Sequence, residues 1–158
     1  MGGMTMTVRL ATLEDVEHLH NLHFKLNRHR HELQPKNFQG KSVDEEWIEE
    51  NLKNSHRDYL VLEVEGEVRG MALVEMLENY SIPGSVKYKY LNILDFMIDS
   101  ELEIETHGHQ LLKAVRQWGK DRYLSYIQLN ELANDIKKID FFAKEQLAVT
   151  QKTFKCVI

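Results

Sequence analysis

The chain of 158 residues contains one cysteine, Cys156, and only two prolines. A single cysteine excludes an internal disulfide, and a thiol this close to the chain end would be held poorly for catalysis. We therefore expect Cys156 to be a buried or half-buried strand residue. No apolar run approaches the roughly 20 residues that a membrane-spanning helix needs, so we expect no membrane partner.

Positive charge is also scarce, because 20 Lys and Arg face 25 Asp and Glu, a formal net charge of −5. This balance disfavours a nucleic-acid partner. The one basic cluster, Arg28 to His31, fits a solvated helix end better than a phosphate contact. The first residues lack the basic and then apolar pattern of a signal peptide, which predicts a cytoplasmic protein. We expect residues 1–5 to be disordered or a cloning remnant.

The composition, 42% hydrophobic and 28% charged, is typical of a folded protein, and the length suits a single domain over residues 1–158. Apolar periodicity predicts helices separated by strands in the order β α α β β β α β α β. The strands are expected at 6–10, 59–64, 68–77, 88–98, 123–130 and 152–158, and the helices at 12–29, 42–52, 110–122 and 135–146.

Local signals support several of these boundaries. Thr12 with Asp15, and Ser42 with Glu45, have the spacing of capping boxes at helix starts. Glu65-Gly66-Glu67 stands between two β-rich runs and predicts a tight hairpin. The later strand–helix–strand unit needs a right-handed crossover, which places a ligand cleft near the end of the 88–98 strand.

The segment that follows this strand is acidic. "DSELEIETHGHQLL", residues 99–112, holds four acids and neither Lys nor Arg. The start of a helix at such a junction offers free backbone N–H groups to an anion, whereas a carboxylate about 6 Å from a phosphate charge costs about 3 kcal/mol at an effective dielectric near 20. Phosphate binding would therefore require Glu101, Glu103 and Glu105 to point outward. Their alternation with Leu102 and Ile104 allows this.

The sequence resembles the GNAT N-acetyltransferase superfamily in its element order and in two segments, "LDFMIDSELEIETHGHQLL" and "LNELANDIKKIDFFAKE". The resemblance implies an α+β fold: a mixed, mostly antiparallel twisted sheet of six to seven strands, with about four helices on both faces. At the three signature positions of the family's pyrophosphate loop this chain has Glu103, Thr106 and Gly108, of which only Gly108 matches. Phe142 stands where the family often has a tyrosine.

The resemblance further implies an N-acetyltransferase that transfers an acetyl group from acetyl-CoA to a primary amine of a small molecule or peptide, by direct attack in a ternary complex. A backbone N–H at Met97 would polarise the thioester carbonyl. The positions that correspond to the family's cofactor-binding residues are Phe96, Met97, Ile98, Glu103, Ile104, Glu105, Thr106, His107, Gly108, His109, Asn130 and Phe142.

Deprotonation of an amine calls for a general base. Asp95 and Glu75 are the candidates, because each is an acid inside an otherwise apolar strand; the alternative is that each is only salt-bridged. His23 lies on the apolar stripe of the first helix and is expected to be a satisfied, half-buried histidine. Neither the histidines of that helix nor His107 and His109 have Cys or carboxylate partners in a recognisable ligand pattern, so we expect no metal site.

Two readings of the function remain at this point. The first is an acetyltransferase with acetyl-CoA and an unidentified amine acceptor as its partners. The second is a catalytically impaired GNAT-like domain that acts as a binding or regulatory module, which the departures at Glu103, Thr106 and Phe142 motivate. Members of the family are often dimers, so the resemblance also allows a homodimer, with Trp47 and the C-terminal strand as candidates for its interface.

Overall fold

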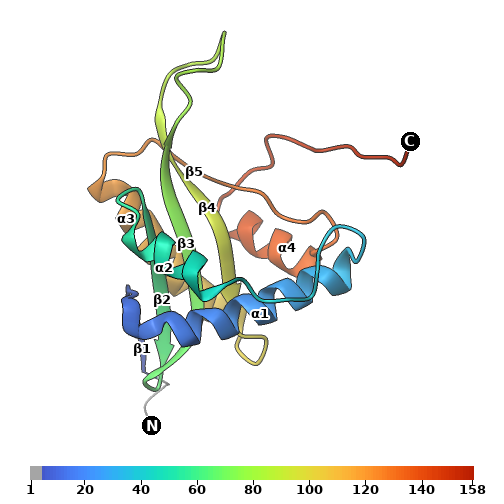
Figure 1. Cartoon of the computed structure of the whole chain (residues 1–158). Coiled ribbons are helices and arrows are strands. Elements are labelled where there is room, and N and C mark those ends of the chain that lie inside the picture. The colour runs from blue at the N-terminus through green and yellow to red at the C-terminus, as the bar shows by residue number, and fades with distance from the viewer. Residues whose placement is uncertain (1–4) are drawn as a thin grey trace.

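The computed structural model describes residues 5–158, and Figure 1 shows them as one curved sheet with helices on both faces. The sheet has five strands in sequence order. The first four strands pair antiparallel, and the last pairs parallel with its neighbour. The strands are β1 (Met6–Leu10), β2 (Arg57–Val64), β3 (Glu67–Glu78), β4 (Lys89–Ile98) and β5 (Tyr126–Leu129).

The helices form two layers (Figure 1). One face of the sheet carries α1 and α2, and the other carries α3 and α4. Their bounds are α1 (Val16–Leu33), α2 (Glu45–Lys53), α3 (His109–Asp121) and α4 (Ile136–Lys144), with a short 3-10 turn η1 (Leu13–Asp15) before α1 and a π-helical turn η2 (Ile104–Gly108) before α3. None of the helices within residues 5–158 has the length and apolar content needed to cross a bilayer.

Each layer has its own apolar core. On the α1 and α2 side, helix residues such as Leu19 and Ile48 pack on strand residues such as Val61 and Leu73, all fully buried. On the other side, the largest contributors are α3, β4 and the phenylalanines of α4. Phe96, Phe141 and Phe142 form a cluster with ring centroids 5.2–5.8 Å apart.

Several local predictions are confirmed. Thr12 and Asp15 form a reciprocal capping box, which starts η1 and leads directly into α1. Glu65 and Gly66, with φ of 51° and 79°, make the tight turn between β2 and β3. Positive φ at both central positions is the conformation that matches the twist of a two-residue hairpin.

Other predictions are wrong. Residues 152–158 form no strand, so the sheet has five strands and not six or seven; Cys156 is exposed. Ser42 does not cap α2, since its hydroxyl donates to the His20 carbonyl of α1 (2.7 Å). Asp44 occupies the N-cap position instead. The prediction of disorder or a cloning remnant covers residues 1–5. Residues 1–4 lie outside the described residues, and the Thr5 carbonyl accepts a hydrogen bond from the Glu65 N–H (3.0 Å).

Candidate functional site

The sheet opens along β4. The parallel pairing of β4 with β5 ends at Ile93 and Leu129, while β4 continues to Ile98. The register between β3 and β4 also shifts here, from Val74 opposite Ile93 to Leu73 opposite Asp95, so that Leu94 is the extra residue of a bulge. Bulges redirect a strand and are common beside functional sites. The second half of β4 therefore has a strand partner on one side only.

The register determines which backbone N–H groups face this opening. Asp99 N–H donates to the Arg69 carbonyl (2.9 Å), beyond the Gly70–Ile98 pair. In an antiparallel ladder, alternate residues bond to the partner strand. Met97 N–H therefore bonds to β3, and the N–H groups of Phe96 and Ile98 point toward the open edge. The sequence predicted a polarising N–H donor in this part of β4, at Met97. The register directs the Met97 N–H toward β3, which leaves the N–H groups of its two neighbours to serve as donors.

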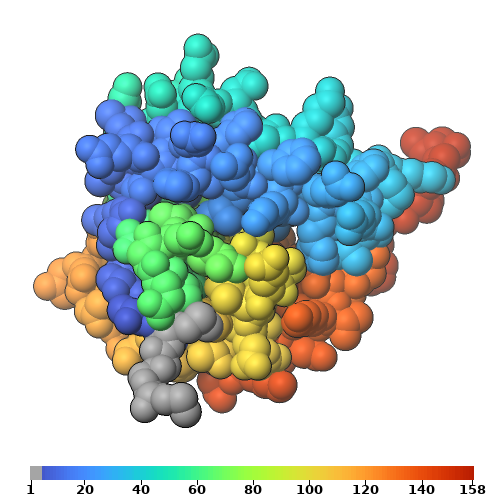
Figure 2. Space-filling view, turned by 90° about the horizontal axis from the view of Figure 1, so that it is seen from below, coloured from blue at the N-terminus to red at the C-terminus, as the bar shows by residue number. Residues whose placement is uncertain are grey.

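The junction between β4 and α3 is helical from Ile104 onward. His107 N–H donates to the Glu103 carbonyl (2.9 Å), and within residues 5–158 the N–H groups of Ile104, Glu105 and Thr106 donate to no protein acceptor. Figure 2 shows this end of the molecule, where the yellow segment around residue 100 lies between the green β2–β3 turn and the orange-red α4. Three free donors at the start of a continuous π- and α-helical run can bind an anion.

The acids of this junction are exposed or paired. Glu101, Glu103 and Glu105 are exposed, whereas Ile104 between them is buried. Glu101 pairs with Arg69 (3.2 Å). Glu103 accepts a long hydrogen bond of 3.5 Å from the Thr106 hydroxyl, so its carboxylate lies over the first turn of the helix.

Asp99 differs from these acids because it is buried. Lys25 and Arg69 each donate to its carboxylate at 3.1 Å. Burial by itself would raise the pKa of Asp99, but the hydrogen bonds from Lys25, the Glu101 N–H and Arg69 together lower it. Asp99 thus ties β3 and α1 to the end of β4 as a structural ion pair.

Gly108 is a packing residue rather than part of a flexible loop. Its backbone is helical, and a Cβ built on it would lie 2.9 Å from Cζ of Phe141 and 3.0 Å from Cγ1 of Ile104. The missing side chain lets the start of α3 approach α4. The neighbouring histidines are held by protein groups: the His107 ring bonds to the Glu103 carbonyl (3.0 Å) and the His109 ring to Glu145 (2.8 Å).

Asp95, one of the two candidate bases, is ion-paired beside the bulge. It accepts a hydrogen bond from Arg30 of α1 (2.8 Å), and the Nδ1 atom of His23 lies 4.0 Å from its other oxygen. Because Asn51 donates to the Tyr59 hydroxyl (3.4 Å), the Tyr59 proton goes to Nε2 of His23 (2.9 Å). The Nδ1 proton of His23 then faces Asp95.

Burial controls the pKa values of His23 and Tyr59. His23 is 1% exposed, and burial lowers its pKa to about 4 despite the nearby Asp95 carboxylate. Burial also raises the pKa of Tyr59 above its usual range. His23 is therefore neutral at physiological pH, as expected for a satisfied core histidine, although it is more deeply buried than the sequence predicted.

Glu75, the other candidate base, lies on the same sheet face and is also paired. Arg57 donates to one of its oxygens (3.2 Å) and Asn92 to the other (2.9 Å). Arg57 in turn donates to Asn51 (2.8 Å), which connects Glu75 to Tyr59 and so to His23. Glu75 and His23 therefore share one hydrogen-bonded network, and Asp95 lies beside it, 4.0 Å from the Nδ1 atom of His23.

The residues in the interior of this network could not be identified from the sequence. The available signal was a polar residue at an apolar position of a helix, which applies both to His23 and to Asn51, 2% exposed in α2. Arg30 was interpreted only as a member of a basic helix end, because its partner Asp95 lies 65 residues away in the chain. Long-range pairing of this kind has no local spacing to reveal it.

The two remaining predicted residues lie at different depths. Asn130 is exposed immediately after β5, where the strand leaves β4. Phe142 is 5% exposed and packs edge-to-face with Phe96. Phe96 and Phe142 are thus brought together under the open half of β4, while Asn130 stays at its rim.

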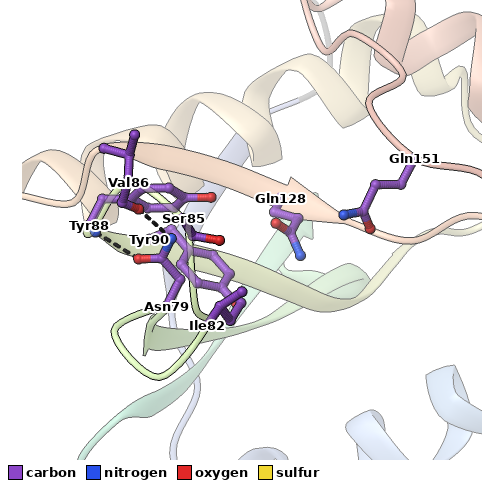
Figure 3. A pocket seen from close by; sticks show the side chains of 8 residues that line it. All are labelled: Asn79, Ile82, Ser85, Val86, Tyr88, Tyr90, Gln128 and Gln151. Carbon is purple, nitrogen blue, oxygen red and sulfur yellow. Dashed lines mark hydrogen bonds between the residues drawn. The ribbon is translucent and has the colours of Figure 1, made fainter.

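A separate hollow of about 450 Å³ lies at the other end of β4 (Figure 3). It is lined by the β3–β4 connection, by Tyr90 and Gln128 of the paired strands, and by Gln151 of the C-terminal segment. Asn79 folds the connection by bonding to the backbone of Val86 and Tyr88, as the dashed lines in Figure 3 show. Its lining carries hydroxyl and amide groups but no charged side chain.

The fold is similar to that of several solved structures. A tetramutant of the BH1408 protein from Bacillus halodurans superposes with a TM-score of 0.90 at 15% identity, covering 96% of this chain and 99% of that one. A transcriptional regulator from Bacillus halodurans C-125 gives 0.77 at 18% identity, covering 98% and 100%. The aminoglycoside N-acetyltransferase AAC(6')-Iy in complex with CoA gives 0.75 at 16% identity, covering 99% and 97%.

Comparison of sequences gives fewer matches than comparison of structures. No curated protein matches the chain. The sequence model described as the acetyltransferase (GNAT) family, in contrast, matches residues 16–146, from the start of α1 to just beyond the end of α4. This range contains the open half of β4, the helical junction and both candidate bases. The chain belongs to the GNAT acetyltransferase family.

Proposed function

We propose that the chain is an N-acetyltransferase that moves an acetyl group from acetyl-CoA to the primary amine of a small molecule or peptide, by direct attack in a ternary complex. The observation that carries this proposal is the adjacency of two features: a strand edge that opens at the Leu94 bulge, and a helix start with three free N–H groups. Family membership and the CoA held by AAC(6')-Iy support acetyl-CoA as the donor.

The residues present fit this cosubstrate. The N–H groups of Ile104, Glu105 and Thr106 would hold the diphosphate, and the outward N–H groups of β4 would bond to the amide-containing arm. The apolar floor formed by Phe96 and Phe142 suits that arm. Glu103 opposes binding, because its carboxylate must turn away from the first helical turn before an anion can approach.

The chemistry that we propose uses a backbone donor and a carboxylate. The N–H of Phe96 or Ile98 would polarise the thioester carbonyl, since a rigid donor stabilises the developing oxyanion without reorganisation. Asp95, next to the bulge, would accept the amine proton, directly or through water. Its pairing with Arg30 fixes its position. Glu75 is the second candidate, farther along the same face.

We place the acceptor in the hollow of Figure 3, since it opens on the sheet face that carries Glu75. Tyr90 and Gln128 would contribute hydrogen-bonding groups and aromatic surface. This lining suits a hydroxylated or amide-bearing amine. AAC(6')-Iy and its relatives in the comparison act on aminoglycosides, so these amines belong in the first acceptor panel.

The test is a transfer assay. Purified protein is incubated with acetyl-CoA and a panel of amines that includes aminoglycosides, polyamines and peptides with free N-termini. Release of free thiol and a gain of one acetyl group by the same amine, read by mass spectrometry, support the proposal. Binding of acetyl-CoA without transfer to any amine is the result expected for a binding or regulatory module.

A further inference from the structure

Lys138 is a buried cation on α4 that the proposed chemistry leaves unused. Its residue exposure is 8%, and it lies one turn before Phe142 on the same helix face. Its nearest acidic partner is Glu131, with Nζ 3.6 Å from the carboxylate, and no hydrogen bond from Nζ to any part of residues 5–158 is within range. Every fully buried side-chain nitrogen or oxygen in this part of the chain has a hydrogen-bond partner. The Lys138 ammonium is therefore not completely buried, and its side chain is 10% exposed.

Lys138 lies close to the split in the sheet, near enough to Asp95 of β4 and Arg30 of α1 for their charges to act on it. Beyond the end of β5 the sheet no longer separates the two helix layers, and α1 meets the start of α4 directly. His29 bonds to Asp135 (2.9 Å), and Asn134 donates to the Leu33 carbonyl (2.8 Å). Lys138 thus lies where α1, α4 and the unpaired half of β4 converge.

The charges around Lys138 come from each of these elements. Burial lowers the pKa of the Lys138 ammonium and is the largest effect. Glu131 from the β5–α4 connection acts in the opposite direction, Arg30 of α1 adds to the lowering, and Asp135 and Asp95 oppose it. An ammonium in this position releases its proton more readily than an exposed lysine does.

We propose that Lys138 donates the proton that the sulfur of CoA takes up as the acetyl group leaves; this inference rests on the proposed function. The amine nitrogen forms a bond to the carbonyl carbon, and the carbon–sulfur bond breaks with its electron pair going to sulfur. The proton moves from Nζ of Lys138 to that sulfur, giving free CoA and a neutral lysine that solvent reprotonates. The amine's own excess proton goes to the base.

The geometry favours Lys138 over its neighbour on the helix. Phe142 has no proton to donate, and the spacing of four residues places both side chains on the inner face of α4. A general acid works best when its pKa approaches that of the group it protonates, here a thiol near 8.5. The buried lysine meets that requirement better than the exposed Lys137 beside it.

The decisive readout does not depend on turnover. CoA is bound to the wild type, K138M and K137M, and the pKa of its thiol in each complex is measured from the ultraviolet absorbance of the thiolate. We expect the wild type and K137M to hold this pKa below that of free CoA. K138M should raise it by about one unit or more, because a cation within a few ångströms of the sulfur is lost.

A second variant separates charge from proton donation. K138R keeps a cation that does not lose its proton, so the pKa of the bound thiol should stay low. The rate at which free thiol is released during acetyl transfer from acetyl-CoA to hydroxylamine should fall by about 100-fold. An unchanged thiol pKa in K138M, or full turnover in K138R, would overturn the inference and leave the proposed function intact. Failure of the wild type to bind CoA would overturn both.

Discussion

At the scale of single residues, His23 is a group whose pKa burial lowers strongly. It is neutral, 1% exposed, and hydrogen-bonded to Tyr59, with Asp95 beyond its other ring nitrogen. The unfolded chain takes up a proton at this residue near pH 6.5, whereas the folded chain does so only near pH 4. The unfolded state therefore binds more protons between these values, and stability must fall as the pH is lowered through this window.

We predict that the free energy of unfolding falls by about 2 kcal/mol from His23 alone between pH 7 and pH 5. H23N should remove this part of the slope, although it lowers stability at pH 7 through lost packing and hydrogen bonding. The measurement is urea denaturation at both pH values. H18N, an exposed change on the same helix, is the control and should keep the wild-type slope. Equal slopes in H23N and H18N would contradict the assignment.

A second residue-scale prediction concerns Glu103. Its carboxylate lies over the first turn of the junction, where it repels an incoming diphosphate. E103Q should tighten acetyl-CoA binding about two- to fivefold at low ionic strength, with a smaller gain in higher salt. Calorimetry of E103Q against E101Q tests this, because Glu101 is already paired with Arg69. An equal gain in both variants would mean that only net charge matters.

The sequence predicted the orientation of these side chains better than their partners. Alternation of Glu101, Glu103 and Glu105 with apolar residues allowed the acids to face solvent, and in the structure all three are exposed around a buried Ile104. The bonds of Asp95 to Arg30 and of Glu75 to Arg57 could not be predicted, because each depends on how distant elements pack. Periodicity reports a face of an element and not what covers it.

At the scale of elements, the β4–α3 junction is a helix start and not an irregular loop. The π-helical turn from Ile104 to Gly108 continues into α3, and none of its residues needs a positive φ. The absence of glycine at Thr106 is therefore compatible with this backbone. Gly108 is required for a different reason, namely the close approach of Phe141.

We predict that G108A destabilises the protein by about 1–3 kcal/mol, since a Cβ placed 2.9 Å from a buried ring forces the helices apart. It should also weaken acetyl-CoA binding, because the free N–H groups belong to the displaced turn. The control is G119A in the same helix, where the nearest atom would be 3.4 Å away and helix propensity improves. Thermal denaturation of both variants gives the comparison; equal stability would rule out the packing role.

The sequence predicted most of the helices and strands, but it predicted their ends less well. Helix α1 extends four residues past the expected His29, and β5 covers only Tyr126–Leu129 of the expected 123–130 strand. The apolar stripe of a helix ends before its last polar turn does, so periodicity underestimates its length. The Leu94 bulge could not be seen in the sequence, because a bulge is defined by the register with β3.

At the scale of the whole molecule, the C-terminal segment has apolar side chains that nothing in a single copy of the chain covers. It leaves the body after α4 (Figure 1), and its apolar side chains are exposed: Val149 73%, Phe154 89%, Val157 91% and Ile158 120%. The strand-like composition of residues 152–158 led to the wrong prediction of a sixth strand. The segment has β-prone residues but no strand within residues 5–158 pairs with it.

We predict that this segment makes the protein self-associate, because an exposed apolar run of this kind gains by covering its surface with a second copy. Sedimentation of the wild type should show a dimer that dissociates on dilution. F154D should be monomeric, whereas V86D, a change at an equally exposed apolar residue of the β3–β4 connection, should not. A wild type that stays monomeric at high concentration would contradict the prediction.

The proposed function requires the open edge of β4 and the helix start beside it to bind acetyl-CoA. The most direct measurement is calorimetric titration of the protein with acetyl-CoA, with free CoA as the comparison, at low and moderate salt. We predict micromolar affinity that weakens with salt, as expected when backbone N–H groups hold a diphosphate against neighbouring carboxylates. No heat of binding at millimolar acetyl-CoA would contradict the account and would mean that this family member uses its fold without the cosubstrate.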